Sequence, residues 1–247
     1  MVISLIFGLC LLVMPKLIPQ NIGIVGLDFL LDKVIIGWII TLVFCVGFVN
    51  AVNMADGANG LIPGIISMAL AIFYMEVGSF TYAIFMTTCG LFTLFNVISG
   101  RLFLGDAGAY GLGSMVALNG LFLYSAGVFS ASFLAVIFAY PCIDILVTVS
   151  RRRIAGRSVL LPDNDHLHNR VHFYFQGWFR SKTLANSITG VLIVSCSSGL
   201  ALLGYNQAWW PVTSNQWAWV FVAQCAMYLA TYVVTGLNRP SSQYVTE

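Results

Sequence analysis

Charge is scarce in this sequence. Only 8% of the 247 residues are charged, against roughly 25% in an ordinary soluble domain. Hydrophobic residues make up 59% of the chain, and the mean hydropathy is +0.90. A soluble fold of this length has too small an interior to bury so much apolar surface. The composition therefore excludes a soluble globular protein and indicates an integral membrane protein.

Paired-cysteine motifs are also missing. The six cysteines stand singly within apolar runs, and no C-x-x-C spacing occurs. This usage is typical of small hydrophobic residues in helices and not of disulfides or zinc ligands. The sequence has no internal repeat, and no polar stretch is long enough to fold as a separate domain. We therefore predict one integral membrane domain over residues 1–247.

Long apolar runs are what the sequence has instead. A helix that crosses a bilayer needs about 20 apolar residues, and the runs predict an all-α polytopic membrane protein with about eight transmembrane segments, the first one partial. The segments are Met1–Met14, Val34–Val49, Leu61–Val77, Phe80–Ile98, Tyr110–Ser125, Phe129–Val149, Leu184–Leu203 and Trp217–Gly236. The glycine-punctuated stretch 18–33 favours a small β-hairpin on the outer face of the membrane.

The basic residues are unevenly distributed along the chain. Nine of the eleven fall in alternate loops or in the C-terminal tail, Arg239 included. Because cytoplasmic loops carry the Lys/Arg excess, we expect the loops at about 50–64, 99–109 and 150–183 and the C-terminus to be cytoplasmic. For Arg151, Arg152 and Arg153 this topogenic role is favoured over a substrate-binding one.

A first polar cluster follows an apolar run directly. The stretch "NAVNMADGANGLIPG" extends from Asn50 to Gly64. Asn50 and Asn53 are i,i+3 neighbours on one helix face, and Asp56 and Asn59 lie in the glycine-rich turn beyond. A helix C-terminus explains asparagine and glycine as stop residues, but it does not explain two asparagines still within the helix. We therefore interpret the cluster as functional.

A second cluster, "FLGDAGAYGLG", runs from Phe103 to Gly113. Glycines at a helix N-terminus let a phosphate approach the backbone, and Asp106 beside them is suited to Mg²⁺. The alternative is that Asp106 caps the next helix while the small residues allow close helix packing. This cluster by itself leaves both readings open.

The third cluster, "RRRIAGRSVLLPDNDHLHNRVH", runs from Arg151 to His172. Arginines and histidines together can clamp a pyrophosphate. For His166 and His168 a solvated loop is the alternative, and a zinc site that includes His172 is a minor one.

Three polar residues lie within apolar runs. Asp144 is either functional or paired with a loop arginine, since an intramembrane acid is a functional candidate by default. Asn96 and Asn119 are expected to form helix–helix hydrogen bonds.

Taken in this order and on one face, the three clusters resemble the polyprenyl-phosphate N-acetylhexosamine-1-phosphate transferases. "NAVNMADGANGL" is similar to that family's N-x-x-N-x-x-D-G-x-[DN]-G-L. "GDAGAYGLG" is similar to G-D-x-G-S-x-x-L-G, with Ala109 at the usual serine, and "PDNDHLHNR", which begins at Pro162, is similar to P-D-x-x-H-[IL]-H-H, with Asn169 at the last histidine. Each motif alone is weak, and the three together are specific.

The resemblance implies a reaction. A sugar-1-phosphate passes from a UDP-N-acetyl-amino sugar to a polyprenyl (undecaprenyl) phosphate and UMP is released, as the first membrane step of cell-envelope glycan synthesis, of cell wall or lipopolysaccharide. The implied cofactor is Mg²⁺, with Mn²⁺ as an alternative. The implied partners are the UDP-amino sugar, the lipid phosphate and the membrane, with no nucleic acid, and a homodimer stays open. The implied location is the inner (cytoplasmic) membrane with a cytoplasmic active face.

The resemblance also implies roles for single residues. Asp106 would be the principal metal ligand with Asn53 beside it, and Asn59 and Phe103 would hold the uracil. The implied catalytic residues are Asp56, Asp106, His166 and His168. The implied substrate-binding residues are Asn50, Asn59, Phe103 and Arg170, and the implied metal ligands are Asp106 and Asn53.

One element of the family pattern has no counterpart. The family carries an adjacent Asp-Asp pair upstream, whereas Asp28 and Asp32 are not adjacent and are predicted on the outer face. We therefore expect the chain to lack N-terminal helices and to have little or no transferase activity alone. The alternatives are a catalytically incomplete fragment or a non-catalytic relative that binds a nucleotide sugar. A transporter fits less well, because its polar groups would lie at the bilayer midplane.

Overall fold

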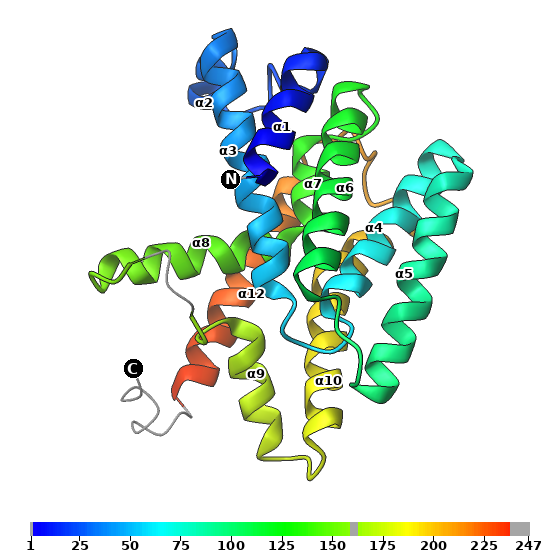
Figure 1. Cartoon of the computed structure of the whole chain (residues 1–247), viewed down its shortest axis with the longest axis vertical. Helices are drawn as coiled ribbons and strands as arrows, with labels where there is room; N and C mark the ends of the chain where they lie inside the picture. The colour runs from blue at the N-terminus through cyan, green and yellow to red at the C-terminus, as the bar shows by residue number, and fades with distance from the viewer. Residues whose placement is uncertain (1, 159–162, 238–247) are drawn as a thin grey trace.

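The computed structural model describes residues 2–158 and 163–237, and this part of the chain is entirely helical outside its turns and loops (Figure 1). Pro162 of the third polar cluster and Arg239 of the basic C-terminal tail lie outside the described residues. The elements in chain order are α1 (Val2–Val13), the 3₁₀ turn η1 (Pro15–Leu17), α2 (Val25–Leu31), α3 (Val34–Ala55), α4 (Leu61–Val77), α5 (Phe80–Ser99), α6 (Gly105–Ser125), α7 (Ala131–Ile137), α8 (Ala139–Ile154), α9 (Leu167–Gln176), α10 (Lys182–Val194), the π-helical turn η2 (Ser195–Gly199), α11 (Leu200–Asn206) and α12 (Trp217–Leu237).

The predicted class, an all-α polytopic membrane protein, is confirmed. Four helical stretches of the described chain are long and apolar enough to cross a membrane: α3, α5, the continuous run Lys182–Asn206 and α12. A fifth is present if the bent pair α7–α8 counts as one span. Because α1 and α4 are apolar but shorter, the expected number of eight segments is not confirmed.

The β-hairpin predicted over 18–33 is wrong, because this described region forms no strand and contains the helix α2. Leu27 and Leu31 stand four residues apart and share one helix face, and Leu31 is buried. Asp28 also accepts a hydrogen bond from the Ile22 N–H at 2.7 Å, which fixes the chain just before the helix.

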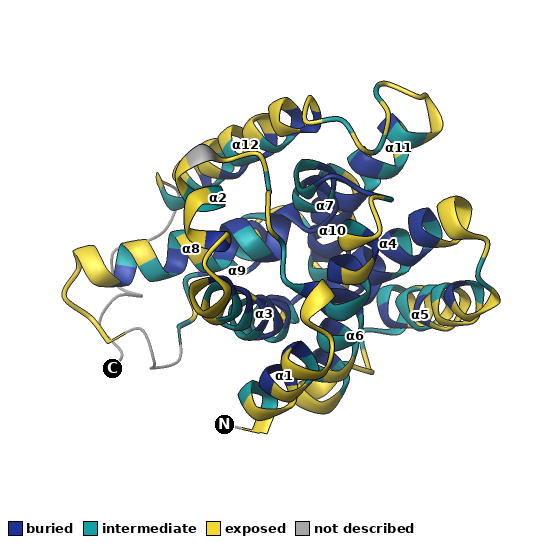
Figure 2. Ribbon diagram, turned by 90° about the horizontal axis from the view of Figure 1, so that it is seen from above, coloured by how far each residue is buried: buried dark blue, intermediate teal, exposed yellow. Residues whose placement is uncertain are grey.

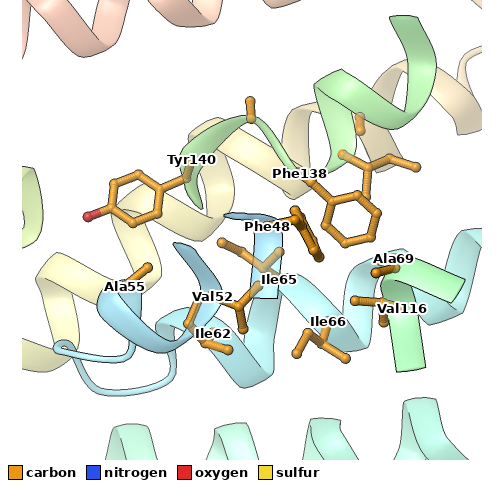
Figure 3. Packing of buried hydrophobic residues seen from close by; sticks show 14 of the residues in the cluster. Phe48, Val52, Ala55, Ile62, Ile65, Ile66, Ala69, Val116, Phe138 and Tyr140 are labelled. Carbon is orange, nitrogen blue, oxygen red and sulfur yellow. The ribbon is translucent and has the colours of Figure 1, made fainter. Parts of the chain in front are cut away.

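The core lies around the first turns of α4. Seen from above, buried residues concentrate on α4, α7 and α10, whereas the outer faces of α5 and α12 are exposed (Figure 2). Figure 3 shows Phe48 and Val52 of α3 against Ile62 and Ile65 of α4, with Phe138 closing the cluster. The exposed outer faces are apolar, as expected for helices that contact lipid.

The run Phe129–Val149, predicted as one span, is broken. At Phe138 the chain turns by 84° between α7 and α8 (Figure 1). Side chains from remote segments satisfy the backbone groups at the break: Ser197 accepts from the Tyr140 N–H at 3.2 Å, and Ser198 donates to the Ile137 carbonyl at 2.9 Å. Because unpaired backbone groups are costly at membrane depth, these bonds make the turn tolerable.

Candidate active site

The first two polar clusters meet where α3 ends and α6 begins. Asn53 Nδ2 donates to Asp106 Oδ1 at 3.0 Å, although 53 residues separate them in the chain. Asp106 lies in the first turn of α6, after Gly105 at φ +62°. The N-cap position is held by Leu104 without a side-chain cap, so the alternative reading of Asp106 as an N-cap is wrong. Its exposed carboxylate is free to take a ligand beside Asn53.

Asp56 lies at the same junction. It caps the C-terminus of α3, and its side chain approaches the N–H of Gly105. Burial raises the pKa of Asp56 to about 6, although the Gly105 N–H acts in the opposite direction. Asn53, Asp56 and Asp106 therefore form one polar group on two helix ends.

The residues expected to bind substrate differ in their hydrogen-bond partners and in their exposure. Asn50 donates within its own helix, to the Val46 carbonyl at 2.7 Å. Asn59 is only 2% exposed and donates to Ser187 Oγ of α10 at 3.1 Å. Phe103 is 54% exposed in the loop before α6, as a ring that stacks on a base would be. The roles implied for these three residues stay predictions.

The two histidines of the third cluster contact polar side chains of α8. His166 Nδ1 lies 2.6 Å from Asp144 Oδ2, and His168 Nδ1 lies 2.8 Å from the Tyr140 hydroxyl. The rings stack with 5.5 Å between centroids and 5° between planes. Both side chains are buried, so the alternative of a solvated loop is wrong for them.

The two histidines differ in charge. Burial lowers the pKa of His166, but the hydrogen bond and charge of Asp144 raise it more, so the net shift is upward. For His168 burial dominates and lowers the pKa to about 4. At neutral pH the pair therefore combines a group that favours the cation with one that stays neutral.

His168 brings the third cluster against the first. A Cβ placed on Gly57 would lie 2.2 Å from His168 Nε2, so only glycine leaves room for the ring. Gly57 follows Asp56 directly. His168 thus lies against the loop that also carries Asp56 of the polar group at the α3–α6 junction.

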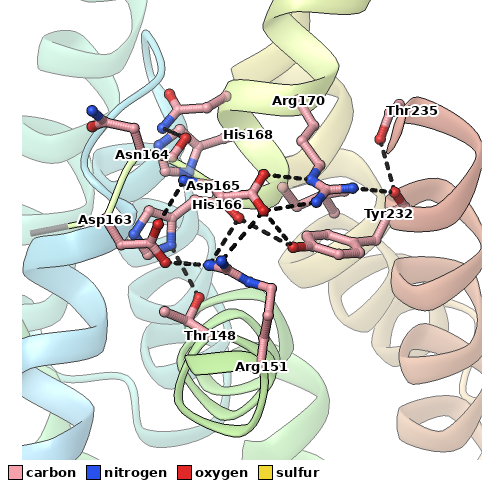
Figure 4. A network of polar contacts seen from close by, with 12 residues as sticks. Thr148, Arg151, Asp163, Asn164, Asp165, His166, His168, Arg170, Tyr232 and Thr235 are labelled. Atoms are coloured by element: carbon pink, nitrogen blue, oxygen red, sulfur yellow. Dashed lines mark hydrogen bonds and ion pairs between the residues drawn. The ribbon is translucent and has the colours of Figure 1, made fainter. Parts of the chain in front are cut away.

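Arg170 belongs to a network that fixes this segment (Figure 4). Its guanidinium forms two parallel bonds to Asp165, at 2.7 and 2.8 Å, and lies 3.5 Å from the centre of the Tyr232 ring on α12. Arg151 in turn pairs with Asp163. The contacts that the structure gives Arg170 are structural, and its implied contact with substrate stays a prediction.

Sequence reasoning missed part of the site. Tyr140 and Tyr228 were not singled out, yet both contact it: Tyr228 donates to Asp144 Oδ1 at 2.6 Å. Asp144 pairs with a loop histidine and not with a loop arginine as one alternative held. The available signal was the i,i+4 spacing of Tyr140 and Asp144 on α8. For the zinc alternative, the described residues contain no group of three histidine, cysteine or acidic side chains suited to a metal.

Comparison with known proteins places this sequence in a family. The profile of glycosyl transferase family 4 matches residues 1–124. The chain belongs to this family. Among relatives, a phospho-N-acetylmuramoyl-pentapeptide-transferase of Levilactobacillus brevis is 26% identical over 66% of this chain and 51% of its own length. A probable undecaprenyl-phosphate N-acetylglucosaminyl 1-phosphate transferase of Bacillus subtilis is 30% identical over 59% of this chain and 44% of its own.

A third relative, a phospho-N-acetylmuramoyl-pentapeptide-transferase of Synechococcus, is 30% identical over 70% of this chain and 50% of its own length. The chain thus spans about half the length of the curated relatives it matches. No solved structure matches it.

Proposed function

We propose that the protein acts in the transfer of a sugar-1-phosphate from a UDP-N-acetyl-amino sugar to a polyprenyl phosphate in the membrane. An oxygen of the lipid phosphate would form a bond to the sugar-bearing phosphorus, and the bond to the UMP oxygen would break. The observation that carries the proposal is the Asn53–Asp106 contact, with Asp56 at the same junction and His168 against the neighbouring Gly57. The relatives' names support the substrate class.

Mg²⁺ fits the residues at the α3–α6 junction. This ion binds through one or two carboxylates and takes its remaining ligands from phosphate oxygens and water. Asp106 offers an exposed carboxylate and Asn53 an adjacent amide, with Mn²⁺ as the alternative ion. When bound, the metal would neutralise charge on the diphosphate.

The protein's own groups would position the reactants. The N-terminus of α6 favours an anion, the exposed ring of Phe103 is available to stack on uracil, and His166 and His168 are available as donors to the diphosphate. We place this site on the cytoplasmic face of the inner membrane, as the basic residues predict.

The test is binding of UDP-GlcNAc to the 247-residue chain in lipid nanodiscs, with transfer of radiolabel to undecaprenyl phosphate measured in parallel. We expect binding that depends on Mg²⁺ and weakens at least about tenfold with EDTA or in Asp106→Ala, as for the loss of a charged contact. Asp32→Asn, on the opposite side of the chain, is the control and should bind normally. Binding without transfer is the result expected of this chain alone, because no counterpart of the family's Asp-Asp pair is found in it. Absence of binding, or binding unchanged in Asp106→Ala, would refute the proposal.

A further inference from the structure

We propose that Asp144 and Tyr140 are positioning residues that hold His166 as an imidazolium and His168 as a neutral ring protonated at Nε2. The two rings then present a pair of parallel N–H donors to a phosphate-bearing ligand. The choice of ligand rests on the proposed function, whereas the assignment of the protons rests on the contacts below.

Asp144 is held as a carboxylate by three donors. Its Oδ1 accepts from the Leu167 N–H at 3.1 Å and the Tyr228 hydroxyl at 2.6 Å, and its Oδ2 lies 2.6 Å from His166 Nδ1. Hydrogen bonds to the charged form of a buried acid favour that form. A buried carboxylate also needs a counter-charge, and His166 is the group in contact with it.

Other groups also surround His166. Thr148 of α8 lies 3.4 Å from its Nδ1 and is uncharged. Asp163 in the adjoining loop favours the cation, whereas Arg151 opposes it, and His168 is stacked on the ring. Because Arg151 is itself paired with Asp163, the contact with Asp144 decides the charge of His166.

Tyr140 decides the tautomer of His168. The Tyr140 oxygen accepts from the backbone N–H of His168 at 3.2 Å. The described residues offer the Tyr140 hydroxyl proton no other acceptor than His168 Nδ1, 2.8 Å away. Nδ1 is therefore the acceptor nitrogen, which leaves the ring proton on Nε2.

Both Nε2–H groups point away from α8, because the Nδ1 side of each ring faces that helix. The planes are 5° apart, and each Nδ1 is bound by a residue of α8 one turn from the other. Among the described residues no hydrogen bond is made to either Nε2. His168 Nε2 lies against Gly57, so its N–H donor faces the loop that carries Asp56 and Asn59.

The arrangement explains why two buried histidines stand two residues apart. A cationic donor and a neutral donor side by side bind an anion without placing two like charges in contact, which would be unfavourable in a buried site. Charge-assisted hydrogen bonds of this kind are the strong ones in phosphate recognition.

The test is ¹⁵N-histidine NMR of the 247-residue chain in nanodiscs. The chain has three histidines, and His172→Gln identifies the third. At pH 7 we expect His166 to show the two similar nitrogen shifts of an imidazolium and His168 the widely separated shifts of one neutral tautomer. Asp144→Asn should neutralise His166 and leave His168 unchanged, and Tyr140→Phe should mix the tautomers of His168 and leave His166 charged.

Matched controls separate positioning from folding. Asp28→Asn removes a carboxylate acceptor elsewhere, and Tyr82→Phe removes a hydroxyl bonded to Asn119 at 2.8 Å. Neither should change the His166 or His168 spectra. A neutral His166 in the unaltered protein, or both rings changing together in either variant, would overturn the proposal.

A second arm adds UDP-GlcNAc with Mg²⁺. We expect both Nε2 signals to shift, and Asp144→Asn to weaken binding by about 10- to 100-fold, as for loss of a charged hydrogen bond. If the protonation states are as described and UDP-GlcNAc shifts neither signal, the positioning roles stand and the proposed function fails.

Discussion

Gly190 offers a quantitative check on how α10 supports the loop at the site. A Cβ at this position would lie 2.0 Å from the carbonyl oxygen of Asn59 and 3.0 Å from its carbonyl carbon. Ordinary van der Waals contact begins at 3.4 Å, so in Gly190→Ala the helix and the loop must separate by about 1 Å or more. The atom in the way belongs to backbone, which cannot turn aside as a flexible side chain can.

The magnitude follows from two opposing effects. Overpacking of this kind costs about 1–3 kcal/mol, and a rigid backbone contact favours the upper end. Alanine improves helix propensity by about 1 kcal/mol. The net loss is about 2 kcal/mol in the free energy of unfolding, which lowers the Tm of a chain of this size by about 4–8 °C.

Thermal unfolding in detergent, followed with a thiol-reactive fluorophore, measures this loss. Cys45 and Cys89 are free and buried, so they become reactive only on unfolding. Gly47→Ala in α3 is the matched control, since a Cβ there meets nothing within 4 Å, and its Tm should stay the same or rise. An equal or higher Tm for Gly190→Ala would refute the close contact between α10 and the loop.

Three further predictions concern the site and its support. Gly57→Ala should displace the His168 ring and weaken UDP-GlcNAc binding at least about tenfold. Gly111→Ala is the control and should bind normally, because a Cβ there meets nothing within 4 Å. Normal binding in Gly57→Ala would contradict the close contact between Gly57 and His168. Because the pKa of His168 is lowered to about 4, its neutral form should stabilise the fold above pH 6.5, and this contribution, up to about 3 kcal/mol, should be lost as the pH falls from about 6.5 to about 4. The Tm difference between the unaltered protein and His168→Gln measures the contribution of His168. His166 and Asp56 are present in both proteins, and because their pKa values are raised, their contributions to stability change with pH in the opposite direction. A Tm difference that stays constant with pH would contradict this prediction. Gln224→Leu should lower the Tm by more than the control Thr231→Val. Gln224 Nε2 donates to the carbonyls of Val136, Cys196 and Ser197 around the α7–α8 break, and each unpaired buried group costs about 1–3 kcal/mol. Equal Tm values for the two variants would show that the break needs no such support.

Sequence signals at the helix ends were enough to predict the bounds of some helices. The predicted segments Leu61–Val77 and Phe80–Ile98 agree with α4 and α5 to within one residue at each end. Two glycines with positive φ bound α4: Gly60 at +73° is its N-cap and Gly78 at +69° is its C-cap.

The break at Phe138 could not be derived in the same way. Pro141 is a signal within the run, since proline is tolerated in the first turn of a helix and not deeper. The size of the turn, however, depends on Ser197, Ser198 and Gln224. These residues are remote in sequence, and only the tertiary structure brings them there.

In the candidate site, too, some contacts could be predicted from the sequence and others could not. Asn53 and Asp106 were predicted to meet because both lie at the same face, and they do. Asn119 was expected to bond a neighbouring helix, and it accepts from Tyr82 of α5. The partner of Asp144 could not be predicted, because whether an arginine or a histidine reaches it depends on the path of the loop. Arg151 and Arg152, read as topogenic, both lie within salt-bridge distance of Asp163.

The π-helical turn η2 gives the run Lys182–Asn206 one residue more than a regular α-helix would need there. Each residue of an α-helix advances the side chains by about 100°, so the surplus residue sets the angular phase of everything that follows it. Removal of Cys196 would restore a regular helix and turn α11 by that angle relative to α10. Insertions and deletions are usually tolerated in loops and not in spans. In this chain a deletion within the π-helical turn would also move Ser197 and Ser198 away from the α7–α8 break that they support.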